Sequence, residues 1–136
     1  LPFDAVRQCE PCRYSMPEAY AAARRLMERC PELTAIFAVS DVMAMGAIRA
    51  IRDMGRRVPE DISVVGFDGI SMSDYLVPRL ATVHQNTQHM AERGVDVLLR
   101  GIERRGPPFH EVVPFQLTAG ESVARLPLSA RDASAS

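Results

Sequence analysis

Short apolar runs alternate with amphipathic segments from Thr34 to Gln85, and this alternation constrains the fold more than any other feature. Leu33–Val39 and Ile62–Gly66 are apolar with little polar alternation, which is typical of strands buried on both faces of a parallel sheet. Between them, Val42–Met54 has apolar residues at helical spacing. Two strands joined by one helix form a right-handed βαβ unit, so the sequence predicts an α/β fold with a parallel sheet flanked by helices.

Further elements are predicted on both sides of this unit. Pro17 suits the first turn of a helix, and Gly55 suits the position just past a helix C-terminus. The other expected elements are a short strand over Ala5–Cys9, a helix over Glu18–Cys30, a strand over Ala81–His84, a helix over Thr87–Arg104 and a strand over Glu111–Leu117, followed by a fraying tail after Ala124.

Composition narrows the class of protein. The 136 residues are 47% hydrophobic and 24% charged, which indicates one globular domain. A net charge of −1 gives no field that would attract nucleic acid or an anionic membrane. No apolar run approaches the roughly 20 residues that span a bilayer. The first residues also lack the features of a signal peptide, so we expect a cytoplasmic protein.

The sequence offers no catalytic constellation. All 16 basic residues are arginine, which excludes a P-loop lysine and a Schiff-base lysine. The three histidines, His84, His89 and His110, lie in different predicted elements. None has a carboxylate or nucleophile at a spacing typical of a catalytic site. We therefore expect no enzyme, no catalytic residue and no cofactor; an α/β enzyme, the remaining alternative, would have to use Asp68.

Cys9 and Cys12 have the spacing of a redox pair or of half a zinc site. A redox pair favours the first thiol at a helix N-terminus, whereas the next predicted helix begins only near Pro17. A zinc site needs two more ligands, and Cys30 and the scattered histidines are the only soft candidates. The odd number of cysteines favours reduced thiols, and we predict no metal site.

Polar residues follow both strands of the βαβ unit, at the sheet edge where open α/β folds bind ligands. Asp68 can accept hydrogen bonds from ligand hydroxyls or cap its own Asp-Gly turn. Ser40 or Asp41 can cap the following helix, and capping alone explains one of them. Tyr14 can stack on a ligand ring or lie as partly packed surface.

The helix over Val42–Met54 is apolar around much of its circumference. One face for the sheet and another for a partner would explain this. The methionines Met43, Met45, Met54 and Met72 suggest a plastic contact surface, with a core position as the simpler interpretation for Met54.

The run TAIFAVSDVMAMGAIRAIRDMGRRVPEDISVVGFD and the later motif Pro78, Leu80, Thr82, Val83 and Gln85 resemble the effector-binding core of LacI/GalR-type transcriptional regulators. The similarity extends weakly from about Tyr14 to Ser122. It implies a type I periplasmic-binding-protein-like fold, in which two α/β subdomains clasp a small molecule. DNA would be bound only through a helix-turn-helix domain absent from this chain.

By the same resemblance, four residues are expected at the ligand. Asp68 matches the ligand-binding aspartate of the family, and Tyr14 falls where members place a stacking aromatic residue. Ser40 stands where many members have a longer asparagine that contacts ligand. Gln85 lies where the chain crosses between subdomains, near the cleft.

The resemblance also implies a division of the chain and a homodimer. Residues 1–86 would be the main part of the C-terminal effector-binding subdomain, 87–114 a segment of the N-terminal subdomain, 115–124 a return strand and 125–136 a flexible tail. The expected dimer interface contains Met43, Met45, Ile48, Met72, Tyr75 and Leu76.

The resemblance thus implies the effector-binding and dimerisation portion of a regulator whose ligand, a sugar, shifts subdomain closure and DNA affinity. The alternative is a sugar-binding receptor of a transport system on the same fold. An upstream helix-turn-helix in the parent gene would favour the regulator.

Overall fold

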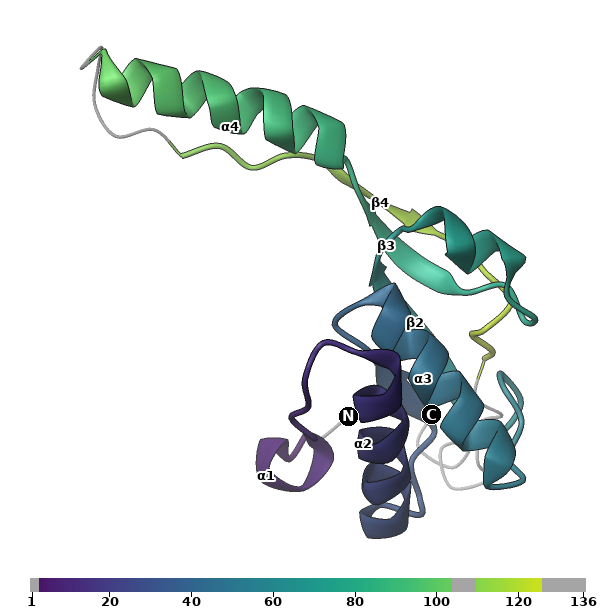
Figure 1. The fold of residues 1–136 in the computed structure, drawn as a ribbon. Coiled ribbons are helices and arrows are strands. Elements are labelled where there is room, and N and C mark those ends of the chain that lie inside the picture. Colours follow the sequence, from purple (N-terminus) through teal and green to yellow (C-terminus); the bar gives the residue numbers. More distant parts are fainter. Residues whose placement is uncertain (1–2, 104–109, 126–136) are drawn as a thin grey trace, which may run out of the picture.

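A four-stranded sheet forms the centre of the fold (Figure 1), in a computed structural model that describes residues 3–103 and 110–125. In spatial order the strands are β1 (Ala35–Phe37), β2 (Ser63–Asp68), β3 (Ala81–Gln85) and β4 (Phe115–Thr118). β1, β2 and β3 are parallel, and β4 runs antiparallel to β3. The predicted α/β class and the mostly parallel sheet are confirmed.

Two long helices cover one face of the sheet. α2 (Met16–Arg29) and α3 (Asp41–Asp53) pack against each other, and α3 packs on β2. Their interface with the sheet is the core, whose largest fully buried apolar side chains are Ile51, Ile62, Val64 and Leu80. Burying a side chain of this size contributes roughly 1.5–3 kcal/mol. The βαβ unit is therefore the most firmly packed part of the chain.

Described residues on the opposite face of the sheet are exposed, which corrects one prediction. Leu33–Val39 was expected to be buried on both faces, but the exposed fractions of Phe37 and Val39 are 62% and 58%. Strand register places the exposed Leu117 opposite Val83 and the exposed Phe115 opposite Gln85. Phe37 packs edge-on against Phe67, with ring centroids 6.5 Å apart. The apolar run Leu33–Val39 therefore contains a strand with two apolar faces. α2 and α3 cover one of these faces.

Near the N-terminus the predicted strand over Ala5–Cys9 is wrong. Residues Ala5–Gln8 form a short helix, α1, because the Asp4 carboxylate accepts the backbone N–H groups of Val6 and Arg7. Gly55 lies just past the C-terminus of α3, as predicted, and has a left-handed conformation with φ 76°. Between β2 and β3 lies a short 3-10 helix, η1 (Ser71–Tyr75), which the sequence did not predict.

The last helix, α4 (Thr87–Ile102), begins where predicted and projects away from α2 and α3 (Figure 1). It has no buried residue, although Met90, Val95 and Leu98 give it an apolar face. Its predicted end at Arg104 lies outside the described residues, as does the predicted tail beyond Arg125. Within the described part of the chain, no helix is both long and apolar enough to cross a membrane.

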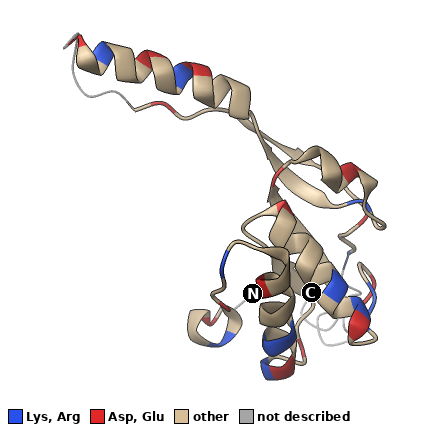
Figure 2. Ribbon diagram, in the orientation of Figure 1, with Lys and Arg blue, Asp and Glu red and all other residues tan. Residues whose placement is uncertain are grey.

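Charged residues of both signs lie together. Figure 2 shows them interspersed along α4 and near the C-terminal ends of α2 and α3. Ion pairs such as Arg49–Asp53 and Arg57–Asp61 join neighbouring residues of opposite sign. This distribution agrees with the net charge of −1, and the part of the chain that the structure describes has no extended basic face for nucleic acid.

Candidate functional site

Asp68 ends β2 at the C-terminal edge of the sheet, where the sequence predicted a ligand site. Its side chain is half-buried and lies between two others. Tyr14 donates its hydroxyl to Oδ2 of Asp68 at 2.7 Å, and Gln85 donates its Nε2 to Oδ1 at 2.8 Å. Three segments far apart in the sequence therefore meet at one carboxylate.

Ser40 joins the same cluster through Tyr14. The hydrogen bond to the Asp68 carboxylate raises the pKa of the Tyr14 hydroxyl, while a hydrogen bond with the Ser40 side chain opposes that shift. Ser40 is fully buried, and its Oγ accepts the backbone N–H of Met43 at 3.2 Å, so it also caps α3. The structure thus joins Tyr14, Asp68 and Gln85 by hydrogen bonds, whereas Ser40 is buried at the start of α3.

The backbone at Asp68 is strained. Its φ of 112° makes it the one non-glycine residue with positive φ in the described part of the chain. Gly69 follows with φ 73°, and a Cβ there would overlap the ring and backbone of His84. Strain of this kind costs of order 1–3 kcal/mol and concentrates at functional sites. The turn is thus held in a conformation that few other residue pairs could adopt.

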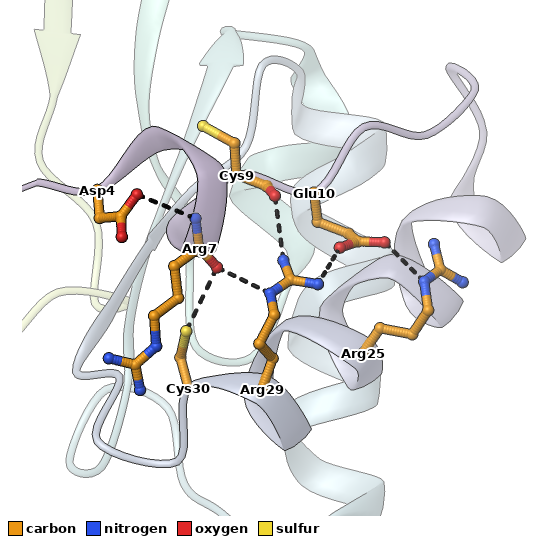
Figure 3. A network of polar contacts seen from close by, with 7 residues as sticks. All are labelled: Asp4, Arg7, Cys9, Glu10, Arg25, Arg29 and Cys30. Atoms are coloured by element: carbon orange, nitrogen blue, oxygen red, sulfur yellow. Dashed lines mark hydrogen bonds and ion pairs between the residues drawn. The ribbon is translucent and has the colours of Figure 1, made fainter.

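A network of arginines holds the segment that leads to Tyr14 (Figure 3). Glu10 forms ion pairs with Arg25 at 2.6 Å and with Arg29 at 2.7 Å. Arg29 also donates to the backbone carbonyls of Arg7 and Cys9. The hydrogen bonds from Arg25 and then Arg29 lower the pKa of the Glu10 carboxyl. This network fixes residues 7–10 against α2 and so limits where Tyr14 can lie.

One residue that sequence reasoning treated only as a possible cap is central here. Asp41 is fully buried, and its Oδ2 accepts hydrogen bonds from the Ile70 N–H and from the Ser73 hydroxyl, each at 2.8 Å. Its Oδ1 accepts from the Thr82 hydroxyl at 2.5 Å. The sequence did hold one sign of this role: Asp41 is a second polar residue beside Ser40, and capping of the helix needs only one of the two.

A cavity of about 410 Å³ opens beside Gln85, where β3 and β4 meet the start of α4. Its walls are mainly apolar, and Gln85 and Glu111 supply polar atoms. The lining residues are Phe67, Val83, Gln85, Asn86, Met90, Glu111, Val113, Pro114 and Phe115. Because Gln85 also bonds Asp68, the cavity adjoins the predicted ligand cluster.

The cysteines form no recognisable centre. All three are unpaired thiols, and Cys30 is buried with its Sγ against the carbonyl of Arg7. Burial raises the pKa of the Cys12 thiol, which disfavours the thiolate that redox or metal chemistry needs. Among the described residues, no group of three or more metal-ligating side chains comes together.

The residues expected at a dimer interface differ in how exposed they are. Met72 and Tyr75 are exposed on η1, while Met43 and Leu76 are half-buried. Met45 and Ile48 are buried inside this chain, at 7% and 6% exposed, and Ile48 belongs to the core cluster. These two side chains of α3 pack mainly within the chain, so they offer little surface to a partner.

Comparison with known proteins adds to this geometry. A family model described as "Periplasmic binding protein-like domain" matches residues 4–123. The chain is 41% identical over 109 residues to the HTH-type transcriptional regulator MalR of Clostridium butyricum, covering 80% of this chain and 32% of MalR. The chain thus spans about a third of the length of this relative.

Solved structures of transcriptional regulators are also similar to this chain. The complex of the transcriptional regulator CelR with cellobiose has a TM-score of 0.83 and 32% identity, covering 90% of this chain and 37% of CelR. The lac repressor dimer bound to operator and the anti-inducer ONPF has a TM-score of 0.78 and 28% identity, covering 84% of this chain and 40% of the repressor chain. These similar proteins are transcriptional regulators, which agrees with the prediction that the chain is not an enzyme.

Proposed function

This chain belongs to the LacI family of transcriptional regulators, as part of its periplasmic-binding-protein-like effector-binding domain, and we propose that it is the sugar-binding and dimerising portion of a repressor. A bound sugar would stabilise one arrangement of the two subdomains and thereby change DNA affinity. DNA would be contacted through a domain outside this chain, and the regulator would act in the cytoplasm.

The observation that carries this proposal is the Asp68 carboxylate at the sheet edge. Tyr14 and Gln85 each occupy one of its oxygens, and a carboxylate has about four lone-pair sites in all. Sugar hydroxyls are donors that can use the remaining sites. A similar solved structure holds cellobiose, which supports a sugar as the ligand class.

The proposed division of the chain follows the same family relation. Residues 1–86 and 115–124 would form the C-terminal subdomain, and 87–114 would belong to the N-terminal one, with 125–136 as a tail. The projecting α4, which has no buried residue, supports this division because its apolar face fits a second subdomain.

The proposed homodimer would use Met72, Tyr75, Leu76 and Met43. Met45 and Ile48 are left out of the proposed interface because they are buried within the chain. The regulator relatives favour this function over a transport receptor.

The test is calorimetry on the full-length protein with cellobiose, lactose, maltose and ribose. We expect at least one sugar to bind, and we expect Asp68→Asn to weaken that binding by about tenfold or more, since it removes a charged acceptor worth roughly 1.5–3 kcal/mol. Asp74→Asn is the matched control, because Asp74 is an exposed aspartate of the neighbouring η1. Equal affinities for wild type and Asp68→Asn would exclude the proposed role.

A further inference from the structure

Asp41 is a buried carboxylate that the proposed ligand contacts do not use. It lies in the first turn of α3 at 0% exposure, directly after the capping residue Ser40. Such a group is stable in the interior only when hydrogen bonds satisfy it. Its three donors come from three places in the fold: the turn after β2, the helix η1 and the strand β3.

A glycine on β2, Gly66, leaves room for the Asp41 side chain. The Asp41 carboxylate passes over β2 at Gly66, where a Cβ would overlap Oδ1 of Asp41 and also approach Leu80. A residue with a side chain at 66 would block the path from α3 to Thr82. The dipole at the N-terminus of α3 adds a favourable field for a negative charge.

The three donors lie close in sequence to the proposed sugar contacts. Ile70 follows the strained pair Asp68-Gly69, so its bond to Asp41 anchors the end of that turn. Ser73 is the buried residue of η1, between the exposed Met72 and Asp74. Thr82 lies on β3, three residues before Gln85, which itself bonds Asp68.

We propose that Asp41 is a positioning residue for sugar binding: its buried carboxylate fixes the turn that presents Asp68 and joins that turn to η1. This inference rests on the proposed function, because it assigns a role at the same site. The contacts of Asp68 itself come from Tyr14, which is 63% exposed, and from the half-buried Gln85. Asp41 therefore supplies the buried anchor of the turn.

Ser73→Ala tests the link with the least disturbance, because it removes one hydroxyl and leaves the Asp41 bonds to Ile70 and Thr82 in place. We expect it to raise the dissociation constant of the sugar roughly fivefold in the full-length protein, the value of about one hydrogen bond. Ser71→Ala, an exposed serine of the same helix, is the matched control and should change affinity less than about twofold. Urea unfolding of each variant measures stability separately. A Ser73→Ala protein that is less stable but binds sugar as wild type does would overturn the positioning role.

A second readout needs no ligand. Amide hydrogen exchange at Ile70 in the full-length protein should be faster in Ser73→Ala and in Thr82→Val than in wild type or Ser71→Ala, because each change loosens the carboxylate that accepts the Ile70 N–H. If exchange accelerates while none of the four sugars binds, the proposed function fails and the role of Asp41 in fixing the turn stands. Unchanged Ile70 exchange in both variants overturns the role of Asp41, whether or not a sugar binds.

Discussion

At the scale of single residues, Asp68 combines a costly backbone conformation with a carboxylate that already accepts two hydrogen bonds. The φ of 112° is held by neighbours on both sides: Tyr14 and Gln85 at the carboxylate, and Gly69 next in the chain. A residue kept in such a conformation suggests that its exact placement serves binding. The contact with Tyr14 can be examined without any ligand.

The pKa of Tyr14 reports that contact. The Asp68 carboxylate raises it above the ordinary value of 10.0, because the hydrogen bond favours the protonated phenol and the negative charge opposes the tyrosinate. In Asp68→Asn the charge is gone, so we expect the Tyr14 pKa to fall toward 10.0. A pH titration of the Tyr14 ring by NMR measures this, with Asp74→Asn as the control. An unchanged pKa in Asp68→Asn would show that the two side chains are apart in solution.

The pKa of the Asp61 carboxyl tests a contact that is not part of the proposed ligand site. Arg57 donates to its carboxylate from the side chain and from the backbone N–H, which lowers the pKa of Asp61 from 3.8 to about 2. A depressed folded-state pKa means that this contribution to stability is fully present above pH 3.8 and is lost as the pH falls toward 2. NMR titration of the carboxyl carbon should show the low value. Titration of Asp61 near 3.8 would contradict the contact.

At the scale of elements, close approach at glycine decides what the sheet tolerates. Gly66→Ala would place a Cβ against both Asp41 and Leu80, so we expect a loss of about 2–3 kcal/mol in the free energy of unfolding. Gly94→Ala is the opposite case, because its added Cβ meets nothing and alanine favours the helix by up to about 1 kcal/mol. Urea unfolding of the two variants measures the contrast. Similar stability changes in both would contradict the packing described for β2.

The elements also show how far the sequence could predict this fold. Periodicity and turn residues predicted α2, β1, α3, β2, β3, α4 and β4 within a few residues. The errors arose where local patterns are ambiguous. Ala5–Gln8 was predicted as a strand but forms α1, which Asp4 caps. The apolar run of β1 did not indicate which face of the strand the helices would cover. The site cluster followed from strand ends and the family resemblance. The role of Asp41 did not, because it depends on three donors that only the folded chain brings together.

At the scale of the whole molecule, α4 and the bare sheet face leave much apolar surface exposed. Leu98, Leu99 and Ile102 are 62%, 52% and 69% exposed on a helix with no buried residue. A helix of this length without tertiary packing is marginal in water. We therefore expect α4 amides to exchange rapidly in the 136-residue chain and to be protected in the full-length protein. Exchange of α3 is the internal reference, since its core residues are buried in either case. Equal protection of α3 and α4 in the short chain would mean that α4 finds a partner there, such as a second copy.

A crystal structure of the full-length protein, grown with a sugar that it binds, tests the role of Asp68 most directly. We expect a sugar hydroxyl within about 2.5–3.0 Å of an Asp68 carboxylate oxygen, with Tyr14 and Gln85 beside the same sugar. A sugar bound elsewhere, with Asp68 still bonded only to Tyr14 and Gln85, would contradict it.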